Sequence, residues 1–188
     1  MRIVESTYPV NLIGSFACSD SELTRIWKMS ERTLQLCMED VFTDCPLYEQ
    51  TLWVGDSRNE GLFSMTTYNH TDILKRCIRL AGQSLEVWPI IPSHCPSSCG
   101  EALLPAWCFL WVISICDYYH YSADQEFLEE VWPMVVQNFK GVEGYQDENG
   151  LFSAPFWNMF DWTDIDDGHQ TVTHNSMLLV GALNDALQ

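Results

Sequence analysis

Basic side chains are scarce in this 188-residue chain, in which nine Lys and Arg stand against 26 Asp and Glu and give a formal net charge of −17. A surface of that sign repels the phosphates of nucleic acids and the head groups of anionic membranes. We therefore expect neither nucleic acid nor membrane among the partners of the protein. A neutral ligand such as a sugar is not opposed by this charge.

Long apolar runs are also missing. The longest candidate, LLPAWCFLWVISICDYY, falls short of the roughly 18–20 residues that cross a bilayer and contains Asp117, so it predicts a buried helix. The first residues, MRIVESTYPVNLIG, show no basic segment followed by an apolar one. The sequence therefore predicts no signal peptide.

Eight cysteines form an even set that invites a disulfide interpretation. Most of them fall within apolar helical patterns, however, and a chain of this length can bury a core without covalent cross-links. Reduced thiols, and with them a cytoplasmic location, are the prediction. Neither HCPSSC nor DWTDIDDG has the ligand spacing of a zinc or an EF-hand calcium site, so we assign no metal and no cofactor.

Helical periodicity dominates the chain after an extended start at residues 1–17. A capping box, Ser19–Glu22, opens the first predicted helix, which runs to about Met38. Further helices are expected at about 55–68, 72–85, 105–121 and 124–139, and from about His174 to the end of the chain. The first helix is expected to place one apolar face inward, made of Leu23, Ile26, Trp27, Ser30, Leu34 and Cys37. A short hairpin is expected at the ENG turn.

The long connections between these helices are rich in acids and aromatic rings. They contain the segments DVFTDCPLYEQTLWVGD, VWPIIPSHC and FWNMFDWTDIDDGH. Aromatic faces stack on the C–H faces of sugar rings, and glycosidases need a carboxylic acid to protonate the leaving oxygen and a second carboxylate opposite it. The pattern favours a carbohydrate site, with solvated acidic loops as the plain alternative.

Five segments carry a more specific signal: SFACSDSELTRIW, TLQLCMEDVFTDCPLYEQTLWVGDSRNE, WVISICDYYHYSAD, MFDWTDIDD and VTHNSM. In order and spacing they resemble the catalytic domain of bacterial α-L-rhamnosidases, glycoside hydrolase family 78. The resemblance extends from Ser15 onward. It implies an all-α fold in which residues 18–188 form about half of an (α/α)6 barrel of twelve helices, an incomplete toroid. Residues 1–17 would be the linker from a preceding β module.

The resemblance also implies roles for individual residues. Asp44 matches an acid that holds the rhamnose hydroxyls, and Asp56 matches a second rhamnose-binding carboxylate, which would also cap the second helix. Glu49 occupies the place of the general acid, and Trp53 that of a ring that packs on the sugar. Two tryptophans would complete the aromatic wall, and one histidine is either a subsite residue or a helix-start residue: Trp107, Trp162 and His174.

The implied reaction is hydrolysis of terminal non-reducing α-L-rhamnose from glycosides with inversion. Glu49 must then remain protonated, which its neighbours Asp44 and Asp56 and burial beside Trp53 would favour. Tyr48 stands where the family often has Arg. The general base is expected in the remaining half of the barrel, so that this chain alone should be inactive or weakly active. A non-catalytic carbohydrate-binding or helical interaction module, or another (α/α)6-barrel glycosidase, stays open as an alternative.

Overall fold

The computed structural model describes residues 2–69, 71–96, 103–162 and 172–188. Within these ranges the secondary structure is helical, with isolated β-bridges and no named strand. The elements are α1 (Ser21–Leu36), α2 (Val54–Thr67), α3 (Asp72–Gln83), the 3-10 turn η1 (Ser84–Glu86), α4 (Pro105–Ser122), α5 (Gln125–Glu143) and α6 (Thr173–Ala186). The all-α prediction is confirmed.

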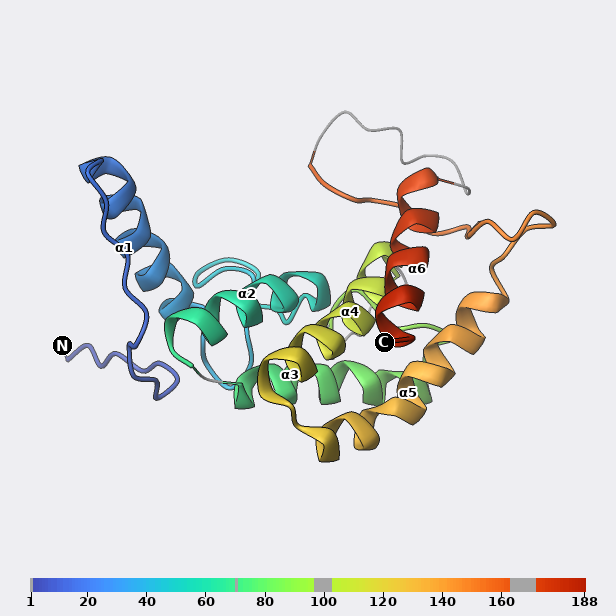
Figure 1. The fold of residues 1–188 in the computed structure, drawn as a ribbon, viewed down its shortest axis with the longest axis horizontal. Coiled ribbons are helices and arrows are strands. Elements are labelled where there is room, and N and C mark those ends of the chain that lie inside the picture. Colours follow the sequence, from blue (N-terminus) through green and yellow to red (C-terminus); the bar gives the residue numbers. More distant parts are fainter. Residues whose placement is uncertain (1, 70, 97–102, 163–171) are drawn as a thin grey trace.

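The helices form two layers. In one layer α4 lies between α2 and α6, and in the other α3 packs beside α5 (Figure 1). Chain order alternates between the layers, so that α2, α4 and α6 belong to one and α3 and α5 to the other. Among the described helices α1 contacts only α2 and projects from one end of the molecule, whereas α6 lies on the far side of α4 and ends the layer that holds α2 and α4 (Figure 1).

Helix α4 is central because its sequence is apolar nearly all round. Trp111 is buried, and its indole Nε1–H donates to the carbonyl of Ile78 on α3 at 3.0 Å. Phe109 meets Phe152 edge to face, with ring centroids 5.3 Å apart. A helix without a polar face has to be covered on every side, and here α2, α3, α5 and α6 cover it.

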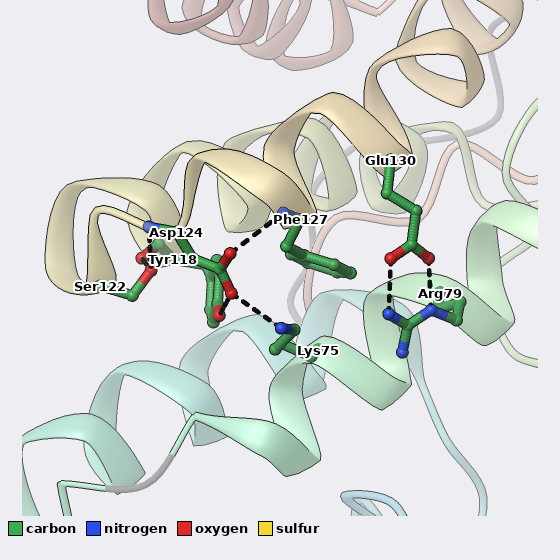
Figure 2. Close-up of polar contacts among 7 residues, drawn as sticks. All are labelled: Lys75, Arg79, Tyr118, Ser122, Asp124, Phe127 and Glu130. Carbon is green, nitrogen blue, oxygen red and sulfur yellow. Dashed lines mark hydrogen bonds and ion pairs between the residues drawn. The ribbon is translucent and has the colours of Figure 1, made fainter.

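Two ion pairs fasten α3 to α5 and to the turn before it (Figure 2). Lys75 Nζ lies 2.7 Å from Asp124 Oδ2, which also accepts from the hydroxyl of Tyr118 at 2.6 Å. Arg79 makes a bidentate pair with Glu130. The hydrogen bond from Lys75 is the largest reason why the pKa of Asp124 is held at about 2. The layer formed by α3 and α5 is therefore held together by ion pairs as well as by packing.

Several local predictions about the helices are wrong. Asp20, and not Ser19, caps α1 by accepting from the backbone N–H of Glu22 at 2.8 Å, whereas the end of α1 at Leu36 agrees with the predicted end to within two residues. Asp56 does not cap α2, because that helix already begins at Val54. Helix α5 continues to Glu143 and α6 ends at Ala186, where the sequence predicted an earlier and a later end.

The predicted inward face of α1 is only partly buried. Leu34 and Cys37 are covered, whereas Leu23 and Ile26 expose 49% and 47% of their surface. The reason is that α1 packs on one helix alone. Half of its apolar stripe therefore lies open.

The N-terminal segment is extended, as predicted, and lies along helix ends. Tyr8 N–H donates to the carbonyl of Met38, and Gly14 N–H to that of Thr67, each at 2.8 Å. The expected hairpin at the ENG turn is a single antiparallel bridge between Gln146 and Phe152.

The cysteines in the described ranges are all free thiols, and five of the seven are buried. Cys99 lies outside those ranges. No helix in the described part of the chain has the length and apolar character needed to cross a membrane.

Candidate functional site

The acid-rich loop after α1 is closed on itself by hydrogen bonds. Asp44 N–H donates to the carbonyl of Thr51 at 3.2 Å, and Thr51 N–H donates to Asp44 Oδ1 at 3.0 Å. Gln50 turns the chain with a φ of 50°, a left-handed conformation. The loop therefore presents the Asp44 carboxylate next to the start of α2.

Trp53 connects this loop with the segment before α4. Its Nε1–H donates to Glu49 Oε2 at 2.7 Å, and its ring lies 4.7 Å from that of His94. The backbone is fixed on both sides, because Val54 N–H donates to the carbonyl of Ser93 at 2.8 Å and the residue after His94 bonds back to Leu52. Trp53 is thus held between two loops that are distant in sequence.

Asp56, in the first turn of α2, meets the first turn of α4. Its Oδ2 accepts from the indole Nε1–H of Trp107 at 3.2 Å. Gly55 makes this approach possible, since a Cβ there would lie 2.8 Å from that same Nε1. The glycine therefore allows the indole of Trp107 to lie directly against the backbone of α2.

These side chains line one cavity of about 160 Å³. The third long loop adds an aromatic side to it, where the rings of Trp157 and Trp162 meet edge to face with centroids 6.1 Å apart. The full lining is Asp44, Glu49, Trp53, Asp56, Leu104, Trp107, Trp157, Met159 and Trp162. Three carboxylates and four indoles from four separate segments thus surround one space.

Each of the three carboxylates has one oxygen fixed by a donor of the protein. Asp44 is held by a backbone N–H, Glu49 by the indole of Trp53 and Asp56 by that of Trp107. Carboxylates held in this way are oriented before a ligand arrives, which lowers the entropic cost of binding. Vicinal hydroxyls and an apolar ring face are the ligand features that match such a wall.

Six of the seven residues predicted for the site line the cavity, and His174 does not. His174 lies in the first turn of α6, where its Nε2 is 3.1 Å from the carbonyl oxygen of Asn158 and its ring is 4.9 Å from that of Phe160. It holds the start of α6 against the third loop. The acids Asp166 and Asp167 of that loop lie outside the described residues.

Burial differs among the acids in a way that the sequence did not indicate. Glu49 is exposed, contrary to the expectation that it is buried beside Trp53. Asp56 is largely covered, and this burial raises its pKa, although the indole N–H of Trp107 acts in the opposite direction. The strongest effect falls on Glu60, whose pKa rises to about 9 because of burial and the nearby charges of Asp56 and Asp44.

Two larger hollows, of about 280 and 430 Å³, lie between α1 and α2. Residues of α1 form most of their walls, together with Phe63 of α2. The first is lined by one tryptophan and one carboxylate, Trp27 and Glu31, and the second by two carboxylates and no tryptophan. Neither matches the three carboxylates and four indoles of the smaller cavity, which is therefore the candidate site. No group of three or more potential metal ligands occurs among the described residues.

Four residues that line or adjoin the cavity were assigned no individual role in the sequence analysis: Leu104, Trp157, Met159 and Glu60. Trp157 precedes Trp162 by five residues in the same acid-rich loop, and this aromatic spacing was the available signal. Glu60 follows Asp56 by four residues, which places both on one helical face. Leu104 and Met159 carry no sequence feature that points to a site.

Gly55 offers a direct test of how the cavity is built. In Gly55→Ala the new Cβ would collide with the indole of Trp107, so this ring and its hydrogen bond to Asp56 must move. We expect about a tenfold loss of sugar affinity, equivalent to about 1.4 kcal/mol, measured by titration of intrinsic fluorescence. Gly181→Ala in α6, where a Cβ meets nothing within 4 Å, is the control for affinity, and unchanged binding by Gly55→Ala would contradict this role of Trp107.

Comparison with family models shows to which family the chain belongs. Residues 11–183 match the family model described as the bacterial alpha-L-rhamnosidase 6 hairpin glycosidase domain. The chain belongs to this family. No curated protein matches it.

Solved structures agree with this rhamnosidase assignment. A GH78 family rhamnosidase of Bacillus sp. GL1 aligns with 96% of the chain at 39% identity and a TM-score of 0.92. A rhamnosidase from Klebsiella oxytoca with rhamnose bound aligns with 94% at 22% identity and a TM-score of 0.78, which shows the shared fold. The chain spans 19% and 35% of the lengths of these two proteins. The six α-helices of the described residues are thus a portion of the six-hairpin (α/α)6 barrel, as predicted.

Proposed function

We propose that this rhamnosidase-family chain supplies the sugar-binding wall and the general acid of a glycosidase that removes terminal non-reducing α-L-rhamnose with inversion. The observation that carries the proposal is the convergence of Asp44, Glu49 and Asp56 with four indoles on one cavity. Retaining and inverting glycosidases alike need a carboxylic acid that protonates the leaving oxygen. A rhamnose ring offers both the hydroxyls and the apolar face that this wall accommodates.

In this proposal Asp44 and Asp56 accept bonds from the sugar hydroxyls, while Trp53 and Trp107 pack on the ring. Glu49 is the proton donor. Its Oε2 is already engaged by the indole N–H of Trp53, so the transferable proton belongs on Oε1. The exposure of Glu49 leaves that oxygen accessible to a leaving group.

The inverting reaction needs a second carboxylate, on the opposite face of the sugar, that activates water. We assign that role to no residue of this chain. The isolated chain is therefore expected to bind rhamnose but not to hydrolyse an aryl α-L-rhamnoside above the background rate. Release of the aryl alcohol measures this directly, with Glu49→Gln as the matched variant. Turnover by the wild type that disappears in Glu49→Gln would refute the incomplete-site proposal.

We also propose that the remaining half of the barrel packs on the two open ends of this one. Met29 of α1 and Phe63 of α2 expose 55% and 58% of their surface at one end, and Met177 and Val180 of α6 expose 69% and 57% at the other. The chain exposes 10,965 Å², whereas a compact monomer of 21.6 kDa exposes about 9,200 Å². Part of the excess belongs to the extended N-terminal segment.

The same open faces favour the second candidate function, a helical interaction module without turnover. As an isolated protein the chain is expected to self-associate reversibly at micromolar concentration, because apolar patches of this kind drive association. Sedimentation velocity measures the effect. Ile26→Asp combined with Phe63→Asp should restore a monomer, while Val87→Asp, at another exposed apolar position, should not. A wild-type chain that stays monomeric up to 100 µM would count against the interaction module.

A further inference from the structure

Glu60 lies directly behind the proposed sugar wall. It follows Asp56 by one turn of α2 and lines the hollow of about 430 Å³ between α1 and α2. Asp44 lines both that hollow and the sugar cavity. Glu60 therefore adjoins, from the rear, the two carboxylates that are proposed to hold the sugar hydroxyls.

One oxygen of Glu60 is buried without a partner. Its Oε2 is inaccessible to solvent and accepts no hydrogen bond from any residue that the structure describes. An ionised carboxylate in such a place pays a desolvation cost with nothing to offset it. Protonation of Glu60 removes that cost.

The groups that face Glu60 from each neighbouring element do not supply a counter-charge. Asp44 comes from the loop, Asp56 from α2, and two thiols from the end of α1 and from α3, namely Cys37 and Cys77. Arg25 also lines this hollow, but its guanidinium makes a bidentate pair with Glu22 at 2.9 and 2.6 Å. Glu60 is thus surrounded by like charges and neutral thiols.

We propose that Glu60, in its protonated form, is a positioning residue that supports the sugar-binding acids Asp44 and Asp56 from behind without adding a third negative charge. The inference rests on the proposed rhamnose site. A neutral Glu60 allows Asp44 and Asp56 to be the ionised acceptors in this cluster. When Glu60 ionises, its charge repels those of Asp44 and Asp56. Either these two side chains move apart or one of them takes up a proton, and in both cases the site loses an ionised acceptor for a sugar hydroxyl.

The direction of the pH dependence follows from the raised pKa of Glu60, about 9 in the folded chain against an ordinary value of 4.5. Between these two pH values the unfolded chain has released the proton and the folded chain still holds it. Rising pH therefore destabilises the folded wild type relative to Glu60→Gln, which cannot ionise. Cys37 and Cys77 do not interfere below pH 10, because burial raises the pKa of Cys37 to about 11 and that of Cys77 still further.

The experiment measures L-rhamnose affinity from pH 6 to pH 10 in the full chain and in Glu60→Gln. We expect the wild type to lose at least tenfold in affinity between pH 7 and pH 10, while Glu60→Gln binds as tightly as wild type at pH 7 and stays constant within twofold. Urea denaturation of both proteins at pH 5, 7 and 9 provides a second readout. The midpoint of Glu60→Gln should exceed that of the wild type by a margin that grows with pH.

Two results overturn the inference while leaving the rhamnose site intact: wild-type affinity that is flat with pH, or Glu60→Gln that loses affinity in parallel with the wild type. A constant difference in urea midpoint across pH 5–9 also overturns it, whatever the binding results. Absence of rhamnose binding by the wild type at every pH would instead refute the proposed function, and with it the positioning role of Glu60.

Discussion

Rhamnose affinity should fall about 100-fold when Asp56 is replaced with Ala. A hydrogen bond to a charged group contributes about 1.5–3 kcal/mol, and this substitution removes both the acceptor for a sugar hydroxyl and the anchor of the Trp107 indole. Isothermal titration calorimetry at pH 7 measures the change. Asp56→Ala that binds within twofold of the wild type would exclude Asp56 from the site.

Two variants separate charge from position in this experiment. Asp56→Asn keeps an acceptor for Trp107 Nε1–H but loses the negative charge, so an intermediate loss of about tenfold is expected. Glu148→Ala, at the exposed tip of the hairpin, removes a carboxylate far from the cavity and should leave affinity unchanged. Because burial raises the pKa of Asp56, neither substitution at this position is expected to lower the stability of the fold by much.

The largest expected effect on stability comes from Gly141→Ala in α5. A Cβ at this position would lie 1.7 Å from the carbonyl oxygen of Pro89 and 2.8 Å from its carbonyl carbon. The Pro89 atoms belong to the backbone, and the new Cβ is attached directly to the backbone of α5. The clash can therefore be relieved only if α5 moves away from the segment that follows η1. We expect a loss of about 3 kcal/mol or more in the free energy of unfolding, at the upper end of the range for overpacking.

Gly181→Ala in α6 is the matched control, since a Cβ there meets nothing within 4 Å. It should stabilise the chain by up to about 1 kcal/mol, through the higher helix propensity of Ala. Urea denaturation followed by far-UV circular dichroism measures both variants. Equal midpoints for Gly141→Ala and wild type would show that α5 and the Pro89 segment are not in close contact.

We also expect Gly141→Ala to disturb the proposed sugar site. The segment that packs on α5 is fixed by Asn138, whose Oδ1 accepts from Ile91 N–H at 2.9 Å and whose amide donates to the carbonyl of Cys108. Further along, that segment carries His94, on which the ring of Trp53 packs. Helix α5 therefore supports, through this segment, the position of the Trp53 indole in the cavity.

The sequence predicted the helices and most of the cavity because both depend on local patterns. The predicted bounds of α2, α3 and α4 agree with the structure to within about two residues. The resemblance of one continuous segment to rhamnosidases predicted site roles for Asp44, Glu49, Trp53 and Asp56, and these four residues line the same cavity. The hydrogen bonds between Asp44 and Thr51 close the loop locally and keep Asp44 near the start of α2.

The features that the sequence did not predict depend on tertiary contacts between elements that are distant in sequence. The stripe on α1 reads as a buried face, but Leu23 and Ile26 lie open because α1 has only α2 beside it. Glu60 reads as an ordinary surface acid of a helix. Its buried oxygen results from the loop that carries Asp44 and from α3, and neither contact is written in the sequence around it.

The central claim is that oriented carboxylates and indoles of one cavity bind a deoxy-sugar. Titration of ¹⁵N-tryptophan-labelled chain with L-rhamnose tests it most directly, with the indole Nε1–H signals assigned by single Trp→Phe substitutions. The signals of Trp53 and Trp107 should shift and saturate together, while that of Trp111, buried and bonded to the carbonyl of Ile78, should stay in place. Indole signals of Trp53 and Trp107 that do not respond to rhamnose would contradict the account.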